Sequence, residues 1–135
     1  MGLVSRAPRG APYWLCLQSI RSYLEIAEIT QLRRDMGPRA ADIAEILPEL
    51  KSKLEWLDTP APLDPEQARF RLYFSITNFL RNISLRHPIV LVLDDLHWAD
   101  DSSLLLLEFL AREIAANSIM VLGAYRGRFV AHGWP

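Results

Sequence analysis

The sequence of 135 residues has little cysteine and no long apolar run. Its single cysteine, Cys16, excludes an internal disulfide and a metal site built from several thiolates. Apolar neighbours on both sides indicate that this thiol packs in a core and is not a reactive nucleophile. The longest apolar runs are far too short to span a bilayer, and the amino terminus has no apolar segment of signal-peptide length. We therefore expect a cytoplasmic chain that makes no contact with a membrane.

An excess of charge of one sign is also lacking. The chain carries 15 basic and 16 acidic residues, with a net charge of −1. Such a balance gives no bulk-charge attraction to nucleic acid. The basic residues Arg33, Arg34 and Arg39 are diluted by acids, which favours a solvated helix face; these acids are Asp35, Asp42 and Glu45. No helix-turn-helix pattern is evident. We expect this segment to bind no nucleic acid.

A glycine-rich phosphate-binding loop is the most informative absence. The sequence has no Gly-x-x-x-x-Gly-Lys-Ser/Thr motif, the loop whose backbone amides cradle the phosphates of a nucleotide. The only lysines, Lys51 and Lys53, lie in a stretch with a helical pattern. A nucleotide site built from this chain alone would therefore lack the usual phosphate cradle.

The most distinctive feature that is present is the aliphatic run Ile89–Leu93, followed directly by Asp94 and Asp95. Ile, Val and Leu without polar alternation predict a parallel strand, at about 88–94, that is buried on both faces. The two acids then lie at the carboxyl edge of the sheet, where open α/β folds bind ligands.

A second apolar strand is predicted at about 119–125, and it ends at Arg126. A helix that opens at Asp100 lies between the two strands, because acids suit the cap and the positive end of a helix. Strand, helix and strand over roughly forty residues form a βαβ unit with parallel strands. Arg126 should therefore lie on the same sheet edge as Asp94 and Asp95.

The stretch from Tyr13 to about residue 86 is predicted to be a helical insert. A first helix ends at Gly37, and a second one is kinked or split at Pro48. A third helix begins after Asp64, which can cap it. The fold class is α/β, and the chain is expected to form one incomplete domain made of an irregular leader (1–12), a helical segment (13–86), the βαβ unit (87–126) and a tail (127–135).

The acidic strand end has the chemistry of a magnesium site. Mg²⁺ prefers oxygen ligands and keeps several waters, so one or two carboxylates beside nucleotide phosphates suit it, and Asp94 has the position for this. Asp95 could polarise or orient an attacking water, and the Arg126 guanidinium could contact a terminal phosphate. Two simpler readings stay open: the acids form a solvated turn, or Arg126 only forms an ion pair with one of them.

Two ring-bearing residues follow the acids. His97 could be a metal ligand or a general base, but no ligand spacing recurs around His87 or His132, so a loop histidine that packs or forms a hydrogen bond is favoured. Trp98 could stack on a nucleobase, although a buried anchor behind the strand end is the favoured interpretation.

A family resemblance lies in the string Leu91–Asp100, which reads Leu-Val-Leu-Asp-Asp-Leu-His-Trp-Ala-Asp and precedes a leucine-rich helix. The string resembles the Walker B region of STAND-type, Orc1-like AAA ATPase modules, found in large LuxR-type transcription regulators and in cyclase- or kinase-linked bacterial signalling proteins. Val121–Arg126 is similar to the sensor 1 strand of these modules. The resemblance covers about 11–126 and implies a partial P-loop NTPase domain of AAA/ASCE type.

The resemblance also implies an ATP-dependent signalling function with ATP and Mg²⁺ as cofactors. Asp94 would hold Mg²⁺ through water, and Asp95 would position the attacking water. Arg126 would sense the γ-phosphate. The catalytic candidates are therefore Asp95 and Arg126, and the cofactor-binding candidates are Asp94 and Arg126.

One departure from the family is the phosphate loop, the Walker A motif, which in the family precedes the matched segment. We expect the chain to be a fragment with weak or no ATPase activity of its own. The strand at Val121 would then have an unpaired apolar edge, where a protein partner or a second copy of the chain could bind. The alternative function is a non-catalytic interaction fragment that binds a related ATPase or regulator.

Overall fold

The computed structural model describes residues 2–5, 12–55, 57 and 59–126. In chain order the elements are β1 (Gly2–Ser5), α1 (Trp14–Ile26), α2 (Ile29–Met36), the 3-10 turn η1 (Gly37–Arg39), α3 (Ala40–Ala44), α4 (Glu49–Lys53), α5 (Pro65–Ser84), β2 (Ile89–Leu93), the 3-10 turn η2 (Leu96–Trp98), α6 (Asp101–Glu113) and β3 (Ile119–Gly123). Among these helices we find none that is long and apolar enough to cross a membrane. The expected tail, 127–135, lies outside the described residues.

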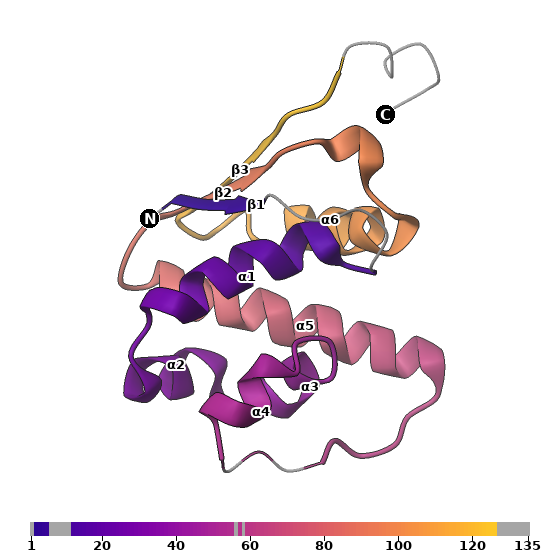
Figure 1. The fold of residues 1–135 in the computed structure, drawn as a ribbon. Coiled ribbons are helices and arrows are strands. Elements are labelled where there is room, and N and C mark those ends of the chain that lie inside the picture. The colour runs from indigo at the N-terminus through magenta and orange to yellow at the C-terminus, as the bar shows by residue number, and fades with distance from the viewer. Residues whose placement is uncertain (1, 6–11, 56, 58, 127–135) are drawn as a thin grey trace.

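Three parallel strands form the sheet, in the order β1-β2-β3 (Figure 1). Leu91, at the centre of β2, pairs with Leu3 of β1 on one side and with Val121 of β3 on the other. The pairing of β2 with β3 confirms the predicted parallel βαβ unit. The expectation of an irregular leader was wrong for Gly2–Ser5, which is strand β1, while 6–11 lie outside the described residues.

The connecting helices lie on one face of the sheet. Strand order advances in a single direction from β1 to β3, and right-handed crossovers then place each connection on the same side. Helix α1 contacts β1 and β2, while α5 contacts β2 and β3. Figure 1 shows both helices running beneath the strands, with α6 beside them.

Strand β2 is fully buried on only one of its faces. Leu91 and Leu93 are buried against the helices, whereas Val90 and Val92 on the opposite face are half-buried. The expected burial on both faces was wrong, because no described helix covers the second face. The neighbouring strand β3 is more open still: Met120, which pairs with Val90, is 57% exposed.

The helical segment breaks where its sequence disfavours a continuous helix. Gly37 ends α2 with a positive φ of 60°, a conformation that glycine adopts without steric cost. Pro48 separates α3 from α4, as predicted. A further break, at Ala27-Glu28 between α1 and α2, was not predicted, because the apolar spacing continues through it.

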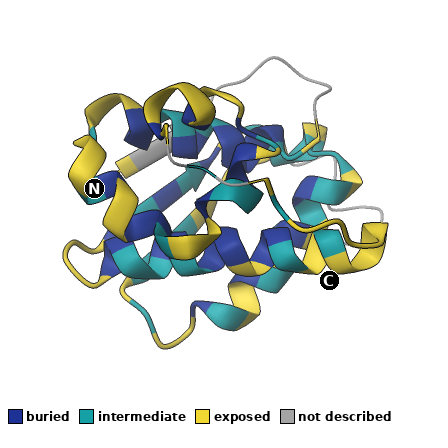
Figure 2. Ribbon diagram, turned by 90° about the horizontal axis from the view of Figure 1, so that it is seen from below, coloured by how far each residue is buried: buried dark blue, intermediate teal, exposed yellow. Residues whose placement is uncertain are grey.

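Helix α5 is the longest element and follows its prediction closely. Asp64 caps it, with a side-chain oxygen that accepts a hydrogen bond from the Gln67 amide at 3.0 Å, and Pro65 occupies the first turn. Figure 2 shows buried and exposed positions alternating along the helices. The buried side of α5 is formed by Leu72, Ile76, Phe79, Leu80 and Ile83.

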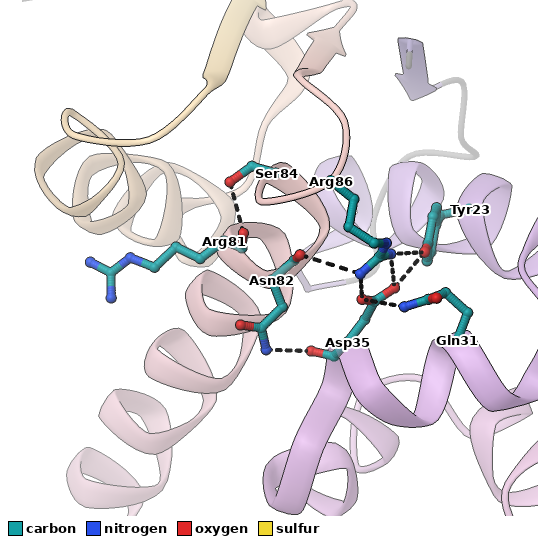
Figure 3. Close-up of polar contacts among 7 residues, drawn as sticks. All are labelled: Tyr23, Gln31, Asp35, Arg81, Asn82, Ser84 and Arg86. Carbon is teal, nitrogen blue, oxygen red and sulfur yellow. Dashed lines mark hydrogen bonds and ion pairs between the residues drawn. The ribbon is translucent and has the colours of Figure 1, made fainter.

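A buried carboxylate lies among α1, α2 and the end of α5 (Figure 3). Asp35 is fully buried, and the Arg86 guanidinium donates to both of its oxygens, from Nη2 to Oδ2 at 2.8 Å and from Nη1 to Oδ1. The Tyr23 hydroxyl donates to Oδ2 at 2.5 Å, and Gln31 donates to Oδ1 at 3.2 Å. Asn82 donates to the Asp35 backbone carbonyl at 2.8 Å. We call these five residues the Asp35 cluster.

The Asp35 cluster joins the helical segment to the start of β2, since Arg86 lies three residues before Ile89. Burial and the hydrogen bond to Asp35 raise the pKa of Tyr23 to about 12. The same carboxylate raises the pKa of Arg86 above its ordinary value. The expectation that Asp35 lies on a solvated helix face was therefore wrong.

Candidate functional site

The carboxyl end of β2 forms a bulge against the end of β3. The Ala124 amide donates to the Leu93 carbonyl at 2.9 Å, and the Ala124 carbonyl accepts from the Leu96 amide at 2.9 Å. In a regular parallel ladder the second bond would come from Asp95, two residues after Leu93. The extra residue makes this a bulge, a feature enriched next to active sites. As a result, Asp94 and Asp95 loop out together at the sheet edge.

The backbone of Asp95 completes this bulge. Its φ of 57° and ψ of 41° lie in the left-handed region, which aspartate tolerates better than most residues. Its amide is released from the ladder and donates instead to Oδ1 of Asp94 at 2.9 Å. The Asp94 side chain is exposed and the Asp95 side chain is 49% exposed, so both carboxylates face water.

Gly123 allows the loop to approach β3 closely. A Cβ atom at this position would lie 2.3 Å from Cδ1 of Leu96, the first residue of η2. The absence of a side chain on Gly123 therefore leaves room for Leu96 beneath the bulge. Together with the two hydrogen bonds of Ala124, this contact fixes the loop that carries the acids.

His97 is largely enclosed within the loop, with 9% of its side chain exposed. Its Nδ1 accepts a hydrogen bond from the Arg126 amide at 3.4 Å. Its Nε2 lies 3.8 Å from Oδ1 of Asp95, which is within ion-pair range but beyond a hydrogen bond, and this nitrogen has no hydrogen-bond partner in the described part of the chain. The loop histidine thus packs and accepts a hydrogen bond, as the sequence favoured.

Arg126 lies at the same sheet edge as the two acids, three residues after the end of β3. It is exposed, and in the part of the chain that the structure describes its guanidinium forms no ion pair with Asp94 or Asp95. The interpretation of Arg126 as the partner of an ion pair with these acids therefore finds no support. The three predicted site residues share one edge, but only the two acids and the backbone of Arg126 are held together.

Asp100 joins the start of α6 to the start of α1. Its carboxylate accepts from the Ser103 amide at 3.2 Å, which caps α6, and from the Tyr13 amide at 3.4 Å. Its charge also contributes to the environment of Cys16: burial first, and the Asp100 charge second, raise the pKa of this thiol to about 12. Cys16 is therefore the inert core thiol that was predicted.

Trp98 differs from its favoured interpretation, because its side chain is 49% exposed and is not a buried anchor. Its ring lies 5.5 Å from that of His97, at an angle of 50°. Two other features were missed by the sequence reasoning: the bulge, and the contact of His97 with the Arg126 amide in the segment that follows β3. The sequence carried one signal for the bulge, since an aspartate directly after a strand tolerates the left-handed conformation.

The donor set fits one side of a magnesium–nucleotide complex. Asp94 uses Oδ1 for the Asp95 amide, and its exposed side chain can still bind a hydrated Mg²⁺ through the other oxygen. No group of three or more potential metal ligands gathers in the described chain, so phosphates and waters would have to complete the coordination. The phosphate cradle does not fit, because the Lys53 ammonium is bound to the Leu24 carbonyl at 2.7 Å within the helical segment.

Comparison with known proteins gives one result. No match was found among curated proteins or among solved structures. A family model described as AAA ATPase domain matches residues 4–122, which covers most of the chain. The matched span runs from β1, through the acidic bulge, into β3. The chain therefore belongs to the AAA ATPase domain family, whose function is of the nucleotide-binding ATPase type.

Proposed function

We propose that this chain is the Walker B and sensor 1 part of a STAND-type signalling ATPase. Asp94 would hold Mg²⁺ through a water molecule, Asp95 would orient the attacking water, and Arg126 would contact the γ-phosphate. Bound Mg²⁺ would supply neutralisation of the charge on the phosphate oxygens. ATP would favour one conformational state of the module, and hydrolysis or exchange would return it to the other.

The observation that carries this proposal is the bulge at the end of β2. The bulge places two adjacent carboxylates at the carboxyl edge of a parallel sheet, next to the strand that leads to Arg126. A solvated turn would not need a left-handed aspartate held by hydrogen bonds from both sides. Such conformations are costly and cluster at functional sites.

The strand order supports a site that a further strand would complete. Open α/β sheets form their ligand crevice where the strand order reverses. The order β1-β2-β3 has no reversal, and β3 is the outer strand on the side of Arg126. The phosphate loop would therefore come from another segment or another chain that extends the sheet beyond β3.

A titration with ATP, with and without Mg²⁺, tests the proposal on the chain as it stands. We expect saturable binding that requires Mg²⁺ and that weakens at least tenfold in Asp94→Asn. Asp101→Asn is the matched control, because it makes the same change of charge at an exposed carboxylate seven residues away, in the first turn of α6. No saturable binding at millimolar ATP, or equal binding by the two variants, would remove the support for this site.

A second candidate function, a non-catalytic interaction fragment, is favoured by the outer edge of β3. The strand is short and apolar, it carries no charged residue, and Leu122 and Met120 on its open face are 49% and 57% exposed. Such an edge can pair with a strand of another chain. Sedimentation velocity tests this: we expect association that rises with concentration and is lost in Met120→Lys but kept in Ile29→Lys, which places the same charge on the exposed start of α2. A monomer at all concentrations would count against self-association.

A further inference from the structure

His97 makes a contact with each side of the candidate site. One ring nitrogen, Nδ1, accepts from the backbone amide of Arg126, and the other, Nε2, faces Asp95 from 3.8 Å. The ring is more than nine-tenths buried, and Nε2 itself is shielded from water. A side chain that only filled space would not need a polar atom directed at each of two candidate site residues.

The tautomer of the neutral ring follows from these contacts. Because Nδ1 accepts the Arg126 amide hydrogen, the ring hydrogen of a neutral His97 sits on Nε2. A buried N–H group without a partner costs free energy. A hydrogen bond from the Nε2–H group to a nearby carboxylate is therefore favourable. The Asp95 carboxylate needs to move only about 0.8 Å closer to accept a hydrogen bond of ordinary length. Its side chain is half exposed and can make this movement.

We propose that His97 is a positioning residue that connects the Asp95 carboxylate to the backbone at Arg126. The imidazole fixes where the carboxylate lies relative to the end of β3, and a displacement of Arg126 moves the ring and, through it, Asp95. This inference rests on the proposed function, in which Asp95 orients water and Arg126 contacts phosphate. It adds a link by which one of these residues responds to the other.

The ring nitrogens of the three histidines can be observed by ¹⁵N NMR of the whole chain, without nucleotide, at mildly alkaline pH. We expect a His97 signal in which Nδ1 is unprotonated and Nε2 carries the hydrogen. Asp95→Asn should shift the Nε2 signal, since it replaces the carboxylate that this N–H faces. Asp94→Asn is the matched control and should leave the signal in place. The opposite tautomer, or an Nε2 signal that Asp95→Asn does not move, would overturn the proposal.

Two substitutions of His97 separate its contact with the Arg126 amide from its contact with the Asp95 carboxylate. Asn at position 97 places its amide oxygen near the position of Nδ1 and keeps the acceptor for Arg126, whereas Gln reaches the position of Nε2 and keeps the donor toward Asp95. In His97→Asn we expect the Arg126 amide signal to be retained and the Asp95 carboxyl ¹³C signal to shift. In His97→Gln we expect the Asp95 carboxyl ¹³C signal to be retained and the Arg126 amide signal to shift.

Thermal unfolding of both variants provides the control for folding, and any variant that does not fold is replaced by the Asp95→Asn comparison above. A residue that only packs would disturb both signals equally in both variants, and that outcome would overturn the link. These signals are read without ATP, so they do not depend on nucleotide binding. A negative ATP titration would reject the proposed function and leave the His97 contacts measurable.

Discussion

An aspartate and an arginine lie near each end of β2, but only the pair at the amino end is in contact. At the amino end, Asp35 is fully buried and Arg86 binds both of its oxygens. At the carboxyl end, Asp94 and Arg126 are exposed and form no ion pair in the described part of the chain. The same residue types thus form a closed structural contact at one end and an open set of polar groups at the other.

The difference shows that charge type alone does not identify a site. In the Asp35 cluster each polar group of the acid is satisfied within the chain, by Tyr23, Gln31 and Arg86, so nothing is left to bind a ligand. At the bulge the backbone is held tightly while the carboxylates face water. A fixed backbone with carboxylates that are open to water is the arrangement that a metal–phosphate ligand requires.

The largest expected effect is the difference in the free energy of unfolding between two variants, each of which loses one carboxylate charge at one end of β2. Asp35→Asn leaves Arg86 without its partner, and breaking a buried pair in this way typically costs about 3–5 kcal/mol. We expect about 3 kcal/mol, the lower end, because 35% of the Arg86 side chain is exposed and water can solvate the guanidinium. Asp94→Asn should change the free energy of unfolding by less than about 0.5 kcal/mol. Urea unfolding followed by circular dichroism measures both, and similar losses would contradict the comparison.

The contribution of Tyr23 to the free energy of unfolding, near the amino end of β2, is expected to depend on pH. Tyr23→Phe removes a hydrogen bond to a charged group and should cost about 2 kcal/mol at pH 7. In the unfolded chain this phenol ionises near pH 10, as in model peptides, and in the folded chain its pKa is raised to about 12. Its contribution is complete below about pH 10 and is lost as the pH rises toward 12. The difference in the free energy of unfolding between wild type and Tyr23→Phe should therefore become smaller over this range.

Unfolding curves for wild type and Tyr23→Phe, recorded between pH 8 and pH 11.5, test this effect. Burial also raises the pKa values of Cys16 and Tyr73 to about 12. Both groups are present in the two proteins, so the difference between the curves isolates Tyr23. A gap that stays constant, or that widens with pH, would show that the phenol is not held by Asp35.

A smaller effect is expected at the helix cap behind the open end. Asp100→Ala removes the cap of α6, a hydrogen bond from the Ser103 hydroxyl and the contact with Tyr13, while Asp64→Ala removes only the cap of α5. Losing an aspartate cap costs about 1 kcal/mol. We expect about that loss for Asp64→Ala and up to about 2 kcal/mol for Asp100→Ala. Equal losses in thermal unfolding would mean that the contacts of Asp100 with the Tyr13 amide and the Ser103 hydroxyl together contribute nothing to stability.

The smallest effect concerns the space beneath the bulge. Gly123→Ala places a methyl group against Leu96, whose side chain can move aside, so we expect a cost near 1 kcal/mol. In a Leu96→Ala background the same substitution should cost almost nothing, because the conflicting methyl group is absent. The amide signal of Asp95 should shift in Gly123→Ala alone. A cost that persists in the double variant would place the strain elsewhere.

Features that depend on neighbouring residues in the chain were predicted well. The aliphatic run predicted β2, Pro48 predicted the split between α3 and α4, and Asp64 predicted the start of α5. The position of Asp94 and Asp95 after the strand followed from the same local pattern. The assigned roles of these acids and of Arg126 remain predictions, which the ATP titration will test.

Features that depend on distant segments could not be read in this way. The strand β1 has only four residues and exists through its pairing with β2, some 88 positions later in register. Asp35 looked like a surface acid because its sequence neighbours are charged, and only the arrival of Arg86 from the end of α5 makes its burial possible.

By itself, the sequence determined that an aliphatic strand ends in two acids, that a capped helix returns the chain to a parallel neighbour, and that the phosphate loop is missing. The tertiary structure decided that the sheet is covered on one face, that Asp35 is buried, and that His97 reaches both Asp95 and Arg126. The physical reason is the separation along the chain over which each interaction acts. Backbone preference and capping act over a few residues, whereas burial, sheet pairing and the bulge at Asp94 and Asp95 require partners that only folding brings within hydrogen-bond distance.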